Sequence, residues 1–199
     1  MKKWIPIALV VLALGVSASM WSGYNALVAL DQAVRAQWAQ VENVYQRRAD
    51  LVPNLVETVK GAAAFEKETY TAVAEARSRV GQISSAGVAD VAKDPEAFRK
   101  FQQAQDGLSS ALSRLMVVSE RYPDLKATAA FRDLQAQLEG TENRITVERM
   151  RFNESAQAFN TRRQRFPTIV MVGFLGSRFA EKSYFTAVKG SDIAPKVKF

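Results

Sequence analysis

Several charged side chains fall on or beside the apolar faces of the helices that the sequence predicts. They are Arg47, Arg48, Glu66, Arg77, Glu142 and Glu148. Carboxylates that face one cleft can share the acid and base roles of glycoside hydrolysis, so an acid pair drawn from Glu66, Glu142 and Glu148 is one hypothesis. The alternative is an internal network, because buried charges are stable only when they are paired and hydrogen-bonded. We favour a buried polar network that fixes helix register, made of Arg48, Glu66, Arg77, Glu142 and Glu148.

The composition excludes most other catalytic chemistry. The chain contains no histidine and no cysteine, which excludes imidazole bases, thiolate nucleophiles and the usual zinc sites. A helical bundle can hold two irons, but that ligand set requires histidine. The sequence also contains no GxxxxGKS/T, GxGxxG, GxSxG or SxxK motif. We therefore predict that the protein is not an enzyme, and we expect no catalytic residue, no metal site and no cofactor.

An uncharged, largely apolar stretch from Trp4 to Trp21 follows two lysines at the N-terminus. A cleaved signal peptide would have this basic start and apolar middle, with the small residues 16–19 as a cleavage site. An uncleaved transmembrane helix also fits, because a helix of this length spans about 27 Å, close to the thickness of the hydrocarbon core. We favour the anchor, since tryptophans suit the two interfaces and helical patterning continues without a break from Tyr24.

Basic residues predict the orientation of this stretch. Lys2 and Lys3 precede it, and no lysine or arginine follows it until Arg35. Positive charge keeps the N-terminus in the cytoplasm, so the rest of the chain is expected on the other side of the membrane. The net charge of +7 suits an anionic surface. Nucleic acid is not expected as a partner, because an exported domain meets no chromosome and the basic residues lack interleaved exposed aromatics.

Apolar residues at heptad spacing predict long helices after the anchor. One stripe contains Phe131, Leu138, Ile145, Phe152, Phe159 and Phe166, and another contains Phe101, Leu108, Leu115 and Tyr122. Helices with such stripes must bury them against one another. The expected fold class is all-α, with an N-terminal transmembrane helix followed by an antiparallel up-and-down four-helix bundle of long helices.

Turn and cap signals predict where these helices begin and end. Pro53 disfavours helical geometry in the residue before it. We therefore expect a turn there rather than a kink, with a second helix from about Leu55. Asp94 followed by Pro95 predicts the start of a third helix, because aspartate is a good cap and proline suits the first turn. Asp124 is expected to open the fourth.

The end of the chain is both basic and apolar. The expected division is an anchor at 1–21, a bundle at 22–166 and a tail at 167–199. If the fourth helix returns toward the bilayer, basic side chains would face anionic headgroups while residues 169–175 dip into the interface or pack under the bundle. The predicted contacts are Arg162, Arg163, Arg165, Arg178 and Lys182, with Lys189, Lys196 and Lys198 further along. The arginines at the helix end would equally suit its negative dipole end.

Several segments carry a resemblance to a known family. They include "RRADLVPNLV", "LEGTENRI" and the pairs Phe152–Asn153 and Phe159–Asn160. Together with most of the remaining chain, they resemble the LemA family of bacterial membrane-anchored proteins. The resemblance implies an N-terminal transmembrane helix and a helical bundle, and it implies no settled activity. This chain has phenylalanine where the family often has tyrosine in those two pairs, so no role for such hydroxyls is expected.

The expected anchor, the expected helical bundle and the lack of catalytic motifs together predict a membrane-anchored, non-enzymatic scaffold or interaction module of the bacterial envelope. We expect a single-pass protein of the bacterial inner membrane, with a cytoplasmic N-terminus and the bundle on the periplasmic or extracellular side. Its expected partners are the membrane and either other envelope proteins or further copies of itself. The alternative of another class is an envelope glycan hydrolase that uses a carboxylate pair.

Overall fold

The computed structural model describes residues 4–60, 67–85, 91 and 94–187 of the chain. Within these residues all regular secondary structure is helical, which confirms the all-α class. The helices are α1 (Trp4–Lys60), α2 (Lys67–Ser85), α3 (Pro95–Ser119), the short α4 (Pro123–Lys126), α5 (Ala129–Gln164) and α6 (Thr168–Leu175), followed by the 3-10 helix η2 (Gly176–Phe179). After η2 the chain continues without helix to residue 187.

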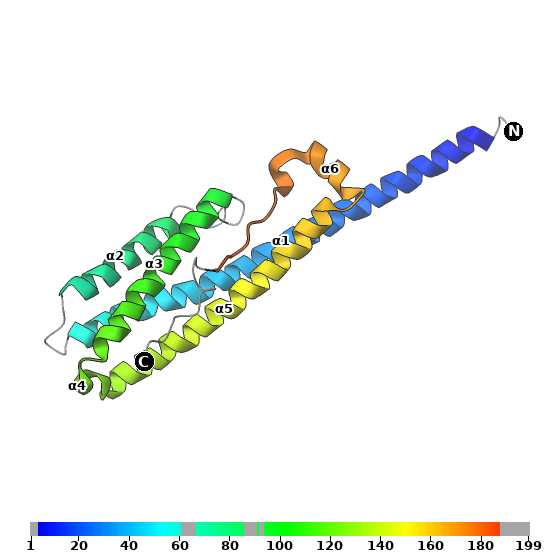
Figure 1. The fold of residues 1–199 in the computed structure, drawn as a ribbon. Helices are drawn as coiled ribbons and strands as arrows, with labels where there is room; N and C mark the ends of the chain where they lie inside the picture. Colours follow the sequence, from blue (N-terminus) through cyan, green and yellow to red (C-terminus); the bar gives the residue numbers. More distant parts are fainter. Residues whose placement is uncertain (1–3, 61–66, 86–90, 92–93, 188–199) are drawn as a thin grey trace, which may run out of the picture.

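Helix α1 is continuous over 57 residues but has two different parts. All its side chains from Trp4 to Ser19 are exposed, whereas one face is buried from Leu27 to Val59. Among the described residues, α1 is the one helix that is long and apolar enough to cross a membrane. Figure 1 shows its N-terminal part projecting beyond the rest of the molecule. The candidate span and the first helix of the folded body therefore belong to one helix, as the sequence predicted.

The turn expected at Pro53 is wrong, because α1 continues through this residue. Proline in a helix cannot donate to the carbonyl four residues earlier, which here belongs to Ala49. Arg77 of α2 compensates, since its Nε donates to Ala49 O at 3.3 Å. Leu55, which was expected to start a second helix, is instead buried on the last turns of α1.

The start of α3 agrees with the sequence, whereas α5 begins later than predicted. Asp94 Oδ1 accepts a hydrogen bond from the Glu96 backbone N–H at 2.9 Å, the bond expected of a cap. Asp124 lies in the short helix α4 instead of opening the long helix. Thr128 caps α5, because its Oγ1 accepts a hydrogen bond from the Phe131 backbone N–H at 3.3 Å.

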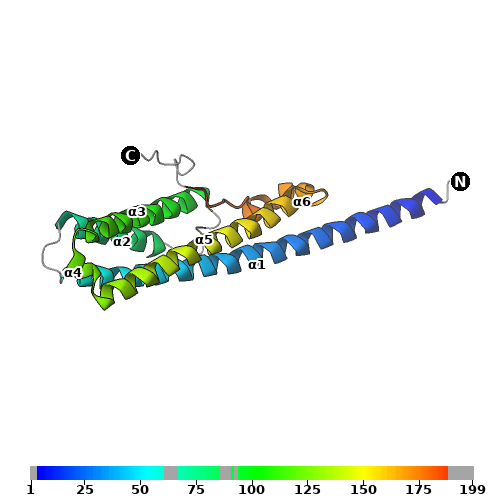
Figure 2. The same ribbon diagram turned by 60° about the horizontal axis from the view of Figure 1, so that its bottom comes forward.

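Helix α5 runs back along α1, and α2 lies beside α3, as Figure 1 and Figure 2 both show. Two buried apolar clusters join these pairs through side chains. The first includes the aromatic residues Trp38, Tyr45, Phe98, Phe101, Phe152, Phe159, Phe179 and Phe185, and the second includes Val52, Leu55, Leu108, Leu115, Phe131 and Leu138. Each large apolar side chain buried in this way contributes about 1.5 to 3 kcal/mol. These clusters hold α1, α3 and α5 close enough for polar side chains to meet between them.

The tail packs against the helices with one face and leaves the other face free. Its buried apolar side chains are Met171, Val172, Phe179 and Phe185, all in the first cluster. Its exposed ones include Ile169, Val170 and Phe174, and Phe166, just before the tail, is exposed as well. The sequence left open whether the tail packs under the helices or faces a membrane, and the structure shows packing for the first set. Lys189, Lys196 and Lys198 lie outside the described residues.

Candidate functional site

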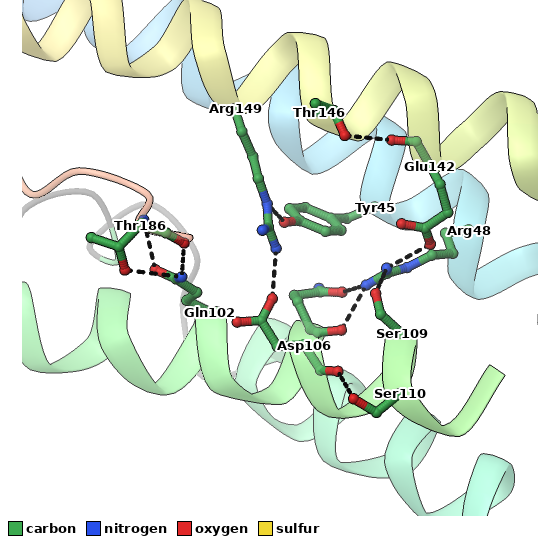
Figure 3. A network of polar contacts seen from close by, with 11 residues as sticks. Tyr45, Arg48, Gln102, Asp106, Ser109, Ser110, Glu142, Thr146, Arg149 and Thr186 are labelled. Carbon is green, nitrogen blue, oxygen red and sulfur yellow. Dashed lines mark hydrogen bonds and ion pairs between the residues drawn. The ribbon is translucent and has the colours of Figure 1, made fainter. Parts of the chain in front are cut away.

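Arg48 forms the centre of a polar network between α1, α3 and α5 (Figure 3). Its side chain is fully buried, with 0% of its surface exposed. Nη1 donates to Ser109 Oγ at 2.6 Å and to Glu142 Oε1 at 2.8 Å. Nη2 donates to the backbone oxygen of Gln105 at 3.1 Å and also to the side-chain oxygen of that residue. A buried cation is tolerated here because one carboxylate and three neutral oxygens surround it.

A second set of polar contacts joins the same three helices one turn away. Arg149 of α5 donates from Nε to the Tyr45 hydroxyl at 2.5 Å, and its Nη2 lies 3.0 Å from Asp106 Oδ1. The guanidinium also lies over the Phe185 ring, 5.1 Å from the centroid. Burial raises the pKa of Tyr45 by more than the nearby arginines lower it, so the phenol stays protonated at neutral pH.

The network contains only part of the set that the sequence predicted. Arg48 and Glu142 come together, as described above. Glu148 lies apart from them, because it accepts hydrogen bonds from Gln37 Nε2 at 2.5 Å and from Arg151 Nη1 at 2.8 Å. Arg77 is exposed and donates to a backbone oxygen of α1 instead. Glu66 lies outside the described residues.

This geometry does not support the acid pair of a glycoside hydrolase at Glu142 and Glu148. The two residues are six apart on α5, which places them about 9 Å apart along the axis and on different faces. Each carboxylate is also engaged by an arginine, Arg48 in one case and Arg151 in the other. An acid and a nucleophile must instead flank one sugar position. What the arrangement can do chemically is to link three helices in one register.

Sequence reasoning missed several members of the network, namely Tyr45, Gln105, Asp106, Ser109 and Arg149. One signal was available for Gln105. It stands in a heptad series with Phe98, Leu112 and Ser119, and all four are buried. A polar residue inside such a series is buried with its neighbours and so requires a partner. Searching every heptad series for polar members would have found it.

The predicted membrane-surface residues separate into two groups. The prediction that Lys182 contacts the membrane surface is wrong, because only 4% of its surface is exposed and its Nζ lies 2.7 Å from Asp31 Oδ1. A lysine can be buried when a carboxylate pairs with it, and the tail crosses α1 where Asp31 supplies that partner. Arg163 is half-buried and donates to the backbone oxygen of Phe179 at 2.9 Å. Arg165 and Arg178 are exposed, and Arg162 is half-buried.

Burial perturbs one further carboxylate near the network, that of Glu42. Among the described residues, no group donates to its buried Oε1. Burial raises the pKa of Glu42 above its ordinary value, and the nearby indole N–H of Trp38 lowers it by less. The side chain faces a hollow between α1, α2 and α3 that Val80, Phe101 and other residues line.

The raised pKa of Glu42 predicts a pH-dependent gain from Glu42→Gln. The folded-state pKa lies above the unfolded one, so ionisation disfavours folding at neutral pH, and this cost disappears below about pH 4, where both states are protonated. Glu42→Gln should therefore raise the melting temperature at pH 7 and raise it less at pH 4. Glu154→Gln, which changes an exposed carboxylate of α5, is the control and should show no such difference between the two pH values. An equal shift at both pH values for Glu42→Gln would contradict the assignment.

Comparison with known proteins agrees with the resemblance seen in the sequence. A family model described as the LemA family matches residues 37–199. The magnetosome protein MamQ of Magnetospirillum gryphiswaldense is 27% identical over 191 residues, which covers 87% of this chain and 70% of that protein. Two proteins of Paramagnetospirillum magneticum, MamQ 1 and MamQ 2, are each 26% identical over 189 residues, covering 88% of this chain and 69% of theirs.

Proposed function

Because this chain belongs to the LemA family, we propose that it is a membrane-anchored, non-enzymatic scaffold or interaction module of the bacterial envelope. The names of the similar proteins refer to the magnetosome and state no reaction. We interpret α1, α2, α3 and α5 as an antiparallel up-and-down four-helix bundle, with an anchor at 1–21 and a tail from residue 167. In this interpretation, the buried polar network fixes the register of the bundle helices relative to one another.

The observation that carries this proposal is the continuity of α1. Its exposed apolar part and its buried part belong to one helix, with no linker between them. A rigid connection of this kind holds the folded body at a fixed position close to the membrane, as a surface for other proteins. Lys2 and Lys3 favour a cytoplasmic N-terminus, so the body belongs on the periplasmic or extracellular side of the inner membrane.

Two measurements test the anchor and the interaction role. Mass analysis of membrane-extracted protein should show an intact N-terminus, and protease added to spheroplasts should digest the helical body. Affinity capture from cross-linked membranes should return a reproducible envelope partner or further copies of the chain. A mature chain that begins near residue 20 would exclude the uncleaved anchor. A protein that is monomeric and captures nothing in several conditions would exclude the interaction role.

The exposed face of α6 supports a second contact with the membrane. Thr168 at the start of α6 packs close to Gly23 of α1, where an added Cβ would lie 3.2 Å from Thr168 Oγ1. The helix therefore lies just beyond the apolar stretch that ends at Trp21. Phe174 is 86% exposed and Ile169 is 52% exposed. Apolar side chains at this position, beside exposed arginines, suit the boundary between headgroups and hydrocarbon.

A chain that begins near Tyr24 is therefore expected to bind vesicles rich in acidic lipid. Added salt should release it, because the Debye length falls to about 10 Å at 0.1 M and screens the arginines. The double change Ile169→Ser and Phe174→Ser should abolish sedimentation with the vesicles. Val117→Ser should leave it unchanged, because Val117 is an exposed apolar residue of α3, away from the tail. Equal binding to neutral vesicles, or full binding by the double variant, would show that α6 only completes the fold.

A further inference from the structure

A segment of the tail, residues 179–186, lies in a groove formed by α1, α3 and α5. Phe179 ends the 3-10 helix η2, and the chain after it continues without helix. Two asparagines of α5 bind its backbone in the same way. Asn160 donates to Lys182 O and accepts from Lys182 N, both at 2.9 Å. Asn153 donates to Phe185 O at 2.9 Å and accepts from Phe185 N at 2.8 Å. Each asparagine amide therefore satisfies both backbone groups of one residue, as a neighbouring strand would do.

The distance between the two asparagines along α5 nearly equals the distance between their partners along the tail segment. The asparagines are seven residues apart on α5, a rise of about 10.5 Å. Their partners are three residues apart in the tail, and three extended residues span about 10 Å. The order is reversed, so the segment runs antiparallel to α5. On α3, Gln102 Nε2 donates to Thr186 O at 2.7 Å and extends the series.

Three side chains of the segment enter the groove at intervals of three residues, and each is buried. Phe179 packs edge-on against Tyr24, with ring centroids 5.8 Å apart. Lys182 forms the ion pair with Asp31, described above. Phe185 lies 4.7 Å from Phe98, 5.4 Å from Phe152 and 6.1 Å from Trp38, measured between ring centroids. The residues between them, such as Glu181 and Tyr184, are exposed. The groove thus recognises a peptide with an aromatic residue at the end of a 3-10 turn, a lysine three positions later and an aromatic residue after three more.

We propose that this groove is a peptide-binding site whose second occupant is the same segment of another copy of the chain. In such a pair, the tail segment of one copy would lie in the groove of the other copy, in place of that copy's own segment, and would link the two molecules. The inference deepens the interaction role proposed above and rests on it, because it gives self-association a specific contact. The required pattern of aromatic residues and lysine is present in every copy, so each copy carries both a groove and a ligand for a groove.

Two features of the structure favour exchange between copies. The segment follows Gly176, whose φ of 62° and ψ of −139° are a backbone conformation that glycine adopts without strain. A change of direction there alters the path of the segment while leaving α6 in place. Anchoring by α1 also holds copies in one membrane with their grooves at the same height, which raises the effective concentration of segment near each groove.

Charge reversal at the ion pair provides the test, with full-length chains in lipid nanodiscs or vesicles. Asp31→Lys and Lys182→Asp each place like charges in a chain's own groove. In a mixture, the groove of the first variant matches the segment of the second, so capture through two different tags should exceed capture within either variant alone by at least about tenfold. Asp31→Lys combined with Lys182→Asp in one chain restores the pair and should return association to the wild-type level. No excess in the mixture of two folded variants would overturn the proposal.

A labelled peptide of residues 176–187 gives an independent readout if a variant fails to fold. Added to the wild-type full-length chain, it should bind and compete with the resident segment. The same peptide with the change Lys182→Glu should bind at least about tenfold more weakly, because Asp31 would face a carboxylate. Equal affinity of the two peptides would also overturn the proposal. Wild-type chains that still capture partners in that case would leave the interaction role intact and exclude only this contact.

Discussion

Replacing Arg48 with alanine is expected to lower the free energy of unfolding by about 3 to 5 kcal/mol. The change removes a fully buried side chain and leaves a cavity between three helices. It also leaves the buried side chain of Gln105 and the carboxylate of Glu142 without their donor. The side chain of Glu142 is 39% exposed and can turn toward water, so the buried glutamine and the cavity account for most of the loss. Urea unfolding followed by circular dichroism measures the change.

Arg47→Ala is the matched control, because Arg47 has the same side chain one position earlier and is exposed. Its loss should change the free energy of unfolding by less than about 0.5 kcal/mol. A second comparison separates the cavity from the unpaired polar group. Arg48→Met fills much of the space, and adding Gln105→Leu removes the unpaired amide, so the pair should recover part of the stability lost in Arg48→Met alone. Equal effects of the Arg47 and Arg48 variants would place the network outside the interior.

The long helices could be predicted from sequence because their apolar series are regular. The series of α5 from Phe131 to Phe159 is buried at every heptad position. Phe166 continues the series by spacing but is 81% exposed, because α5 ends at Gln164. Periodicity therefore predicted which face of the helix is buried, while the end of the helix depended on local backbone geometry.

The error at Pro53 came from giving a single residue more weight than the series that passes through it. Two heptad series of α1 continue across the proline without a change of phase. They are Leu27, Val34, Val41, Arg48 and Leu55, and Asp31, Trp38, Tyr45, Val52 and Val59. Every one of these residues is buried. A turn at Pro53 would break both series, whereas a helix that loses one hydrogen bond keeps them, and the Arg77 contact offsets the loss.

The same two series contain the charged residues Asp31 and Arg48. Periodicity alone could not predict their partners. Their burial follows from heptad position, but the partner of each comes from a distant part of the chain. Arg48 meets Glu142 of α5, and Asp31 meets Lys182 of the tail. The segment around Lys182 is extended and has no helical period, so its burial depends on the asparagines of α5. Only the tertiary arrangement shows that this lysine is internal.

Trp38→Ala is expected to cause a loss of similar size, about 3 to 5 kcal/mol. The indole is only 4% exposed and lies where α1, α3, α5 and the tail meet. Its ring centroid is 5.2 Å from Phe101 and 5.4 Å from Phe152, both at near-edge angles that add to the burial energy. Alanine would remove these contacts together, and the aromatic residues around it cannot close the space without leaving their own helices.

Trp21→Ala separates this packing effect from a general effect of losing tryptophan. Trp21 lies on the same helix but is 74% exposed, at the end of the apolar stretch. Its loss should leave the unfolding of the helical body unchanged. Trp38→Phe should cost less than Trp38→Ala, because it keeps a ring in the cluster.

The chain contains three tryptophans, so fluorescence from a Trp4→Phe and Trp21→Phe background reports on Trp38 alone. In that background, unfolding should shift the emission to longer wavelength in the same transition that circular dichroism records. If the emission changes at a lower urea concentration, the aromatic cluster opens before the helices separate, and the tail is the element that leaves first.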